Sequence, residues 1–77
     1  MEMRLDRITW NPRQMNGQPC IRGMRLTVRR VLEAVAFYPN RDDLYRNYLE
    51  LEPEDVRQAL AFAAANLVDE ASETPAA

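Results

Sequence analysis

Residues 23–39 read GMRLTVRRVLEAVAFYP, and they decide the fold because the spacing of apolar residues changes within them. The apolar residues after the change follow the i, i+3, i+4, i+7 spacing of one helix face: Val28, Val31, Leu32 and Val35. Thr27 is a good N-cap for this helix, and Pro39 ends it at about Tyr38. The stretch therefore predicts a first helix that buries one face.

The residues before this helix carry the signals of a two-stranded arm. Residues 3–10 alternate imperfectly between apolar and polar, which predicts a short strand. Asn16 and Gly17 form a tight-turn dipeptide, and residues 19–21 can pair back as a second strand. Because an isolated two-stranded hairpin is barely stable, we expect the arm to lie against the helices or against a second copy.

Two further helices follow the first. Asn40 can cap a short second helix that ends by Leu49 or Glu50. Pro53 is suited to the first position of a third helix. The third helix has an apolar stripe made of Val56, Ala59, Leu60, Ala63, Ala64 and Leu67. Three short helices with brief connections are compatible with a helix-turn-helix unit.

The length of 77 residues limits the chain to one small domain with a marginal core. We expect a mainly α domain over residues 1–70, with a β-hairpin arm in 1–23, a three-helix bundle in 27–70 and a disordered tail in 71–77. A single cysteine excludes an internal disulfide. Self-association or a partner protein is the support that remains, so we expect a homodimer.

Apolar residues never form a run long enough to cross a membrane, the longest being residues 59–65. The first twenty residues are charged and contain a proline, without an apolar signal-peptide centre. An unpaired cysteine fits a reducing compartment. We therefore expect a cytoplasmic protein that has no membrane partner.

Charge is divided unevenly along the chain. Residues 1–31 hold seven arginines against two acids, whereas residues 32–77 hold three arginines against ten acids. All ten basic residues are arginine, which suits bidentate binding of phosphate or carboxylate, although a GC-rich genome explains the bias equally well. Such polarity indicates an anionic partner rather than a fold.

Residues 17–28, GQPCIRGMRLTV, closely resemble the signature Gly-x-Pro-x-Ile-x-Gly-x-Arg-x-x-Val of the family catalogued as domain of unknown function 433. Further matches are Tyr48, Leu51, Glu54, Asp55, Val56, Ala59 and Leu60. The resemblance implies a homeodomain-like helix-turn-helix fold with an N-terminal strand arm that helps to build dimers. It also implies an antitoxin of a bacterial type II toxin–antitoxin pair, a kind of protein often encoded beside a PIN-like nuclease.

The candidate anion-binding residues surround the start of the first helix: Arg22, Arg25, Arg29 and Arg30. Cations at a helix N-terminus are unfavourable, and a bound anion reverses that effect. The anion could be a DNA phosphate or the acidic, metal-binding centre of a partner nuclease. Alternatively, Glu33 neutralises Arg29 and Arg30 locally at helical spacing.

The third helix offers two side chains that could read DNA bases, Arg57 and Gln58, on the face opposite its apolar stripe. Acids beside them would repel phosphates. We therefore favour the alternative that Arg57 forms a surface ion pair with a nearby acid, and we expect only weak DNA binding by the protein alone.

Three apolar residues are candidates for core packing or for a dimer contact. Ile8 and Trp10 on the arm are most simply core residues, and edge-to-edge pairing of two arms is the alternative. Phe62 lies off the apolar stripe of its helix, which raises the odds of an interface. Packing by the arm of the same chain is the favoured explanation for Phe62.

Catalytic chemistry finds little support in the residue types present. The chain lacks histidine, and Cys20 between Pro19 and Ile21 reads as a small buried filler. The acids that could hold magnesium mostly sit where helix N-termini favour negative charge: Asp42, Asp43, Glu50, Glu52, Glu54 and Asp55. We expect no enzyme activity, no metal and no cofactor.

The function that best fits these observations is a dimeric antitoxin that neutralises a PIN-like nuclease toxin and represses its own operon. One alternative is a stand-alone helix-turn-helix transcription regulator, which would bind its operator tightly without a toxin. The other is a protein-interaction module with no role in nucleic-acid binding.

Overall fold

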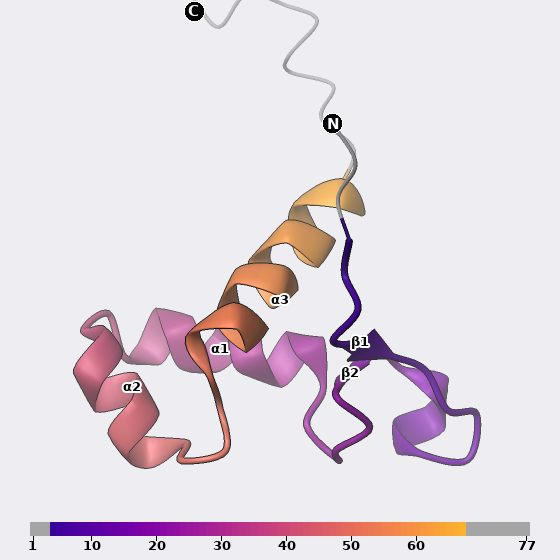
Figure 1. The fold of residues 1–77 in the computed structure, drawn as a ribbon, viewed down its shortest axis with the longest axis horizontal. Coiled ribbons are helices and arrows are strands. Elements are labelled where there is room, and N and C mark those ends of the chain that lie inside the picture. The colour runs from indigo at the N-terminus through magenta and orange to yellow at the C-terminus, as the bar shows by residue number, and fades with distance from the viewer. Residues whose placement is uncertain (1–3, 68–77) are drawn as a thin grey trace, which may run out of the picture.

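The computed structural model describes residues 4–67, which form a small hairpin and three helices (Figure 1). The elements in chain order are β1 (Ile8–Thr9), the single 3₁₀ turn η1 (Met15–Gly17), β2 (Cys20–Ile21), α1 (Val28–Phe37), α2 (Arg41–Asn47) and α3 (Pro53–Ala65). The prediction of a mainly α chain with an N-terminal antiparallel hairpin is confirmed. The predicted tail, residues 71–77, lies outside the described residues, as does the end of the predicted bundle at 68–70.

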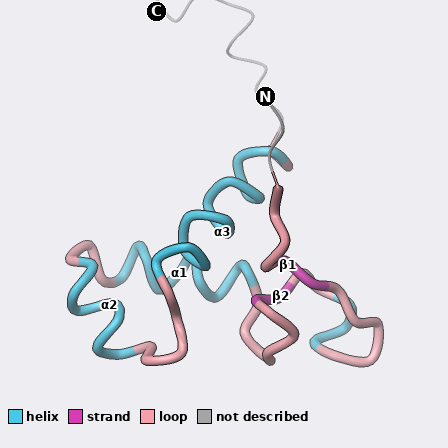
Figure 2. Tube along the Cα trace, in the orientation of Figure 1, coloured by secondary structure: helices cyan, strands magenta, loops and turns pink. Residues whose placement is uncertain are grey.

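The hairpin is shorter than the sequence predicts. Ile8 pairs with Ile21 and Thr9 pairs with Cys20, and strand structure is confined to these four residues (Figure 2). The expected strand over residues 3–10 is therefore wrong in extent. The chain turns just before β1, because the Ile8 N–H donates to the Leu5 carbonyl at 3.2 Å.

Two tight turns shape the chain on either side of β2. The predicted turn at Asn16 and Gly17 is confirmed, with φ of 59° and 77°. After β2, Arg22 and Gly23 have φ of 47° and 72°, as in a type I′ turn. The Ile21 N–H donates to the Leu26 carbonyl at 2.9 Å, so the chain folds back beside β2 and leads directly into α1.

The helix boundaries follow from local capping groups. Thr27 Oγ1 accepts the Arg30 N–H at 3.1 Å at the start of α1. Asn40 Oδ1 accepts the Asp42 N–H at 2.8 Å at the start of α2. Both predicted caps are confirmed, as is Pro53 as the first residue of α3. Capping satisfies backbone N–H groups that have no partner within the helix.

The core lies where α3 crosses α1. Figure 1 shows α3 rising from the middle of α1, with the hairpin near one end of α1 and α2 near the other. The buried apolar residues come from all of these elements and their connections: Ile8, Ile21, Leu26, Val28, Val31, Ala34, Leu44, Leu51, Val56 and Ala59. Within residues 4–67, no helix has both the length and the apolar character needed to cross a membrane.

The apolar stripe predicted for α3 is buried only along its first half. Val56 and Ala59 are in the core, but Leu60 is 40% exposed, Leu67 is 74% exposed and Ala64 is exposed. The predicted stripe is wrong in extent: α3 ends at Ala65, so Leu67 lies beyond the helix, and α1 and the hairpin cover only part of the last turns of α3. Spacing within a helix identifies an apolar face and not how far neighbouring elements cover it.

Candidate anion-binding site

Arg22 binds an anion, but that anion belongs to the same chain. Its Nε donates to Asp55 Oδ1 at 3.1 Å, and its Nη2 donates to Asp55 Oδ2 at 2.9 Å and to the Glu50 carbonyl at 2.7 Å. Asp55 is fully buried. A buried carboxylate needs a paired charge, so Arg22 has a structural role and does not join the candidate site for an external ligand.

A second arginine completes the pairing of Asp55. Arg7 Nη1 donates to Asp55 Oδ1 at 3.0 Å and to Glu52 Oε1 at 2.7 Å. Burial alone would raise the pKa of Asp55, but hydrogen bonds from Arg22, from the Glu52 N–H and from Arg7 outweigh it and lower this pKa below its ordinary value of 3.8. Asp55 therefore stays ionised and ties both ends of the hairpin to α3.

Gln58 lies inside this network instead of on an outer face. It is 2% exposed, and its Oε1 accepts the Arg7 N–H at 2.8 Å. Its Nε2 donates to Asp6 Oδ1 at 2.9 Å and to Glu54 Oε2 at 2.8 Å. The expectation that Gln58 reads DNA bases is wrong for the free protein, because the residues before β1 cover this side of α3.

Arg57 forms the surface pair that the sequence favours. Its Nε donates to Glu54 Oε1 at 2.9 Å and its Nη2 donates to Glu54 Oε2 at 2.5 Å. Hydrogen bonds from Arg57 and then Gln58 lower the pKa of Glu54 to about 2. The first turn of α3 thus presents acids and an arginine that is already paired.

Three arginines near the start of α1 remain exposed: Arg25, Arg29 and Arg30. Arg29 Nε lies 3.5 Å and Arg30 Nε lies 3.8 Å from Glu33 carboxylate oxygens, and their side chains are 81% and 63% exposed. Such long, solvated contacts are worth ~0–1 kcal/mol. Glu33 therefore neutralises both arginines only loosely, and both stay available to a stronger anionic partner.

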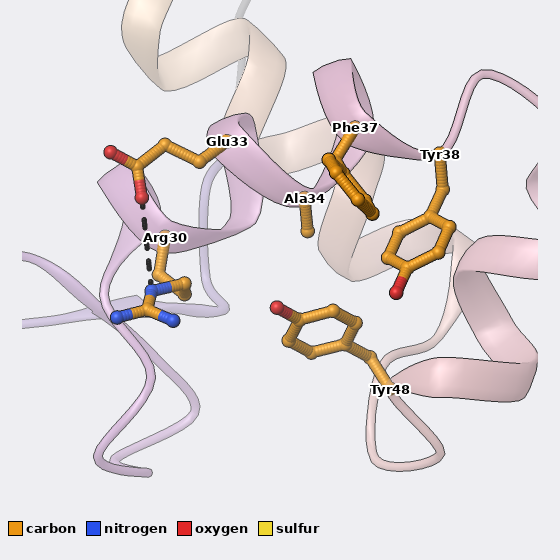
Figure 3. Close-up of a pocket in the computed structure, with 6 residues that line it drawn as sticks. All are labelled: Arg30, Glu33, Ala34, Phe37, Tyr38 and Tyr48. Carbon is orange, nitrogen blue, oxygen red and sulfur yellow. Dashed lines mark ion pairs between the residues drawn. The ribbon is translucent and has the colours of Figure 1, made fainter.

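Arg30 borders a cleft of about 290 Å³ between α1 and the segment that follows α2 (Figure 3). Figure 3 shows the guanidinium at one end of the cleft and the rings of Phe37 and Tyr38 at the other, with the Tyr48 hydroxyl between them. The ring centroids of Phe37 and Tyr38 lie 4.8 Å apart, and those of Tyr38 and Tyr48 lie 6.4 Å apart. The cleft can hold an anionic group beside an apolar or aromatic one.

Arg29 borders a different depression on the molecule. This groove of about 300 Å³ has nearly apolar walls from Pro19, Val28, Leu32, Phe62 and Leu67. The two neighbouring arginines share Glu33 as a partner but border different hollows. Within one turn of α1, Arg29 borders the groove and Arg30 borders the cleft, so each hollow has one arginine beside it.

The aromatic residues of the arm and of α3 meet on the surface. Ile8 is 5% exposed, so its predicted core position is confirmed, but Trp10 is 58% exposed and its predicted core position is wrong. β1 ends at Thr9, so strand alternation does not extend to Trp10. Trp10 packs on Phe62 with ring centroids 5.7 Å apart, which confirms the packing of Phe62 by the arm of the same chain.

Sequence reasoning missed the polar residues that join the hairpin to α3, namely Arg7 and Asp55. They are 48 residues apart in the chain, and local spacing carries no signal for such a contact. In the sequence, the favourable interaction of an acid with the N-terminus of a helix is a sufficient reason for an aspartate at position 55. Cys20 is buried as predicted, and its thiol donates to the Gln18 carbonyl at 3.4 Å. Residues 4–67 hold no group of three metal-ligating side chains.

One family model matches the amino-acid sequence of most of this chain. The family described as "Protein of unknown function (DUF433)" matches residues 8–63. The chain belongs to this family. In this DUF433 protein, the matched range runs from β1 into the C-terminal half of α3. No curated protein and no solved structure matches the chain significantly.

Proposed function

We propose that this DUF433 protein is the antitoxin of a type II toxin–antitoxin pair, a dimer that binds and neutralises a PIN-like nuclease toxin and represses its own operon. The observation that carries the proposal is the cleft in which exposed Arg30 lies beside Phe37, Tyr38 and Tyr48. Arginine and tyrosine are the residues that most often dominate binding energy at protein interfaces. A partner that offers a carboxylate and an apolar side chain fits this cleft.

Neutralisation follows from the charge of the exposed arginines. The acidic, metal-binding centre of a nuclease attracts cations, and a guanidinium can pair with its carboxylates in a bidentate manner. Arg30, with Arg25 and Arg29 beside it, would occupy that centre in place of the metal's charge. The loose contacts to Glu33 at 3.5 and 3.8 Å are weak enough to be exchanged for stronger ones.

Operon repression would use α2 and α3 as a homeodomain-like helix-turn-helix whose DNA affinity comes mainly from phosphate contacts. In the free protein Gln58 is buried, Arg57 is paired with Glu54, and the first turn of α3 is acidic. These features support weak DNA binding by the antitoxin alone. Phosphate contacts of this kind weaken steeply as salt is added.

The test is neutralisation of the nuclease encoded in the neighbouring reading frame. That nuclease expressed alone should arrest growth, and co-expression of this chain should restore it. The double variant Arg29→Ala/Arg30→Ala should bind the nuclease at least about tenfold more weakly and fail to restore growth. Purified variants should keep the helical circular-dichroism spectrum, because both side chains are exposed.

Arg46→Ala is the matched control. Arg46 is also an exposed arginine, 70% accessible, in an i, i+3 pair with Asp43, but it lies on α2. It should restore growth like the native chain. The proposal fails if the neighbouring frame encodes no nuclease, if the native chain does not restore growth, or if the double variant restores it fully.

A further inference from the structure

The C-terminal half of α3 is an uncharged surface that the other described residues, 4–67, leave largely uncovered. Residues 58–67 read QALAFAAANL and contain no charged side chain. Leu60 is 40% exposed and Leu67 is 74% exposed, and Leu67 shares a groove with Phe62, on which the 58% exposed ring of Trp10 packs. Exposed apolar side chains gathered at one end of a helix on a small protein mark an interaction site.

The same part of α3 offers both a groove and a ridge. The groove of about 300 Å³ lies where the core-facing side of α3 runs on past the packed part of α1, with Phe62 on one wall and Val28 on another. Leu60 and Ala64 are one turn apart on the neighbouring, exposed side of α3 and form the ridge. A second α3 could therefore fill the groove with its own ridge.

We infer that a second copy of this chain docks here, with the C-terminal halves of the two α3 helices packed against each other. A two-fold dimer brings one surface against itself, so a patch that carries both ridge and groove is self-complementary. The absence of charge over residues 58–67 avoids the like-charge repulsion that two identical charged surfaces would suffer. Gln18, Arg29 and Asn66 border the groove and supply the polar rim usual at such interfaces.

This contact replaces the arm-to-arm pairing that the sequence suggests. β1 has only two residues, and Ile8 is committed to the core. The α3 contact also leaves the cleft of Arg30 open, because that cleft and the α3 groove have no lining residue in common. The inference rests on the dimer named in the proposed function and not on its toxin, so a failure of self-association and a failure of growth rescue are told apart by separate measurements.

Sedimentation velocity of the full chain tests the contact, at concentrations from about 1 µM to about 500 µM. Native protein should sediment as a dimer at the upper end, and the emission of Trp10, its one tryptophan, should shift to the blue as the dimer forms. Ala64→Glu should raise the dissociation constant at least about tenfold, because the ridge would then carry a carboxylate into the nearly apolar groove of the partner. Its helical content should not change, since Ala64 is exposed in the single chain.

Leu49→Glu is the matched control, because Leu49 is 84% exposed and lies outside the groove, between α2 and α3. It should associate like the native chain. The inference is overturned if native protein stays monomeric at the highest concentration, which would leave the groove to an unrelated protein or to another part of the chain. It is equally overturned if Leu49→Glu weakens association as much as Ala64→Glu.

Discussion

Asp55 connects three parts of the chain through a single carboxylate. Arg7 from the residues before β1 and Arg22 from the turn after β2 both donate to it, and the Glu52 N–H donates to Oδ2 at 2.9 Å. Breaking a buried pair costs more than the pair contributes, because the remaining charges lose their partner in a poorly hydrated site. The hairpin, too short to be stable by itself, is held to α3 in this way.

Asp55→Ala should lower the free energy of unfolding by roughly 3–5 kcal/mol, a large share of the stability of so small a domain. Urea denaturation followed by circular dichroism measures the change. Asp43→Ala is the control, because Asp43 pairs with Arg46 on the surface and such a pair contributes ~0–1 kcal/mol. Equal urea midpoints for the two variants would contradict the structural role of Asp55.

The same carboxylates make stability depend on pH at the acid end. The pKa of Glu54 is lowered to about 2 from an ordinary value of 4.5, and that of Asp55 is lowered as well. The unfolded chain then binds more protons than the folded one, so this stabilisation is complete above pH 4.5 and is lost as pH falls toward 2. Urea midpoints measured across this window should fall with pH, and Glu54→Gln should flatten the slope. An unchanged slope in that variant would contradict the hydrogen bonds assigned to Glu54.

At the scale of elements, the boundaries of the helices are local properties. Thr27 Oγ1 accepts an N–H from the first turn of α1, and the turn at Arg22 and Gly23 delivers Thr27 to that position. Thr27→Ala should therefore lower the free energy of unfolding by about 1 kcal/mol, whereas Thr27→Ser should retain most of the cap. Thermal unfolding compares the two variants, and equal melting temperatures would show that the cap contributes nothing.

The length of each element, and the extent to which it is buried, depended on contacts between elements. The spacing of apolar residues within one helix or strand carries no information about those contacts. β1 contains only Ile8 and Thr9. The chain turns at Leu5 just before it, and after Thr9 the backbone no longer pairs with β2. α3 remains helical to Ala65, but its buried residues all lie in its first half, and its second half is only partly covered, with Phe62 against Trp10. A pattern of apolar residues predicts a helix and its face, whereas the extent of burial depends on where the other elements end.

At the scale of the whole molecule, folding removes much of the basic character of the first third of the chain. Residues 1–31 carry a net charge of +5 in the sequence, yet Arg7 and Arg22 are neutralised by acids of the second half. Three of the arginines that stay exposed lie near the start of α1, namely Arg25, Arg29 and Arg30. The charge asymmetry thus joins the two halves of the chain, and the proposed function assigns part of the remaining positive charge to a partner.

The sequence by itself determined the tight turn at Asn16 and Gly17, the caps of α1 and α2, the start of α3 and the membership of the family. Each of these depends on residues within a few positions of one another, where backbone geometry and short-range hydrogen bonds decide the conformation. Only the tertiary structure decided that Gln58 is buried, that Trp10 is exposed and that Arg22 is paired. The physical reason is that Gln58 and Arg22 form hydrogen bonds with groups that lie 33 to 52 residues away in the chain. The exposure of Trp10 likewise depends on how far α3, which lies far from it in sequence, covers its ring.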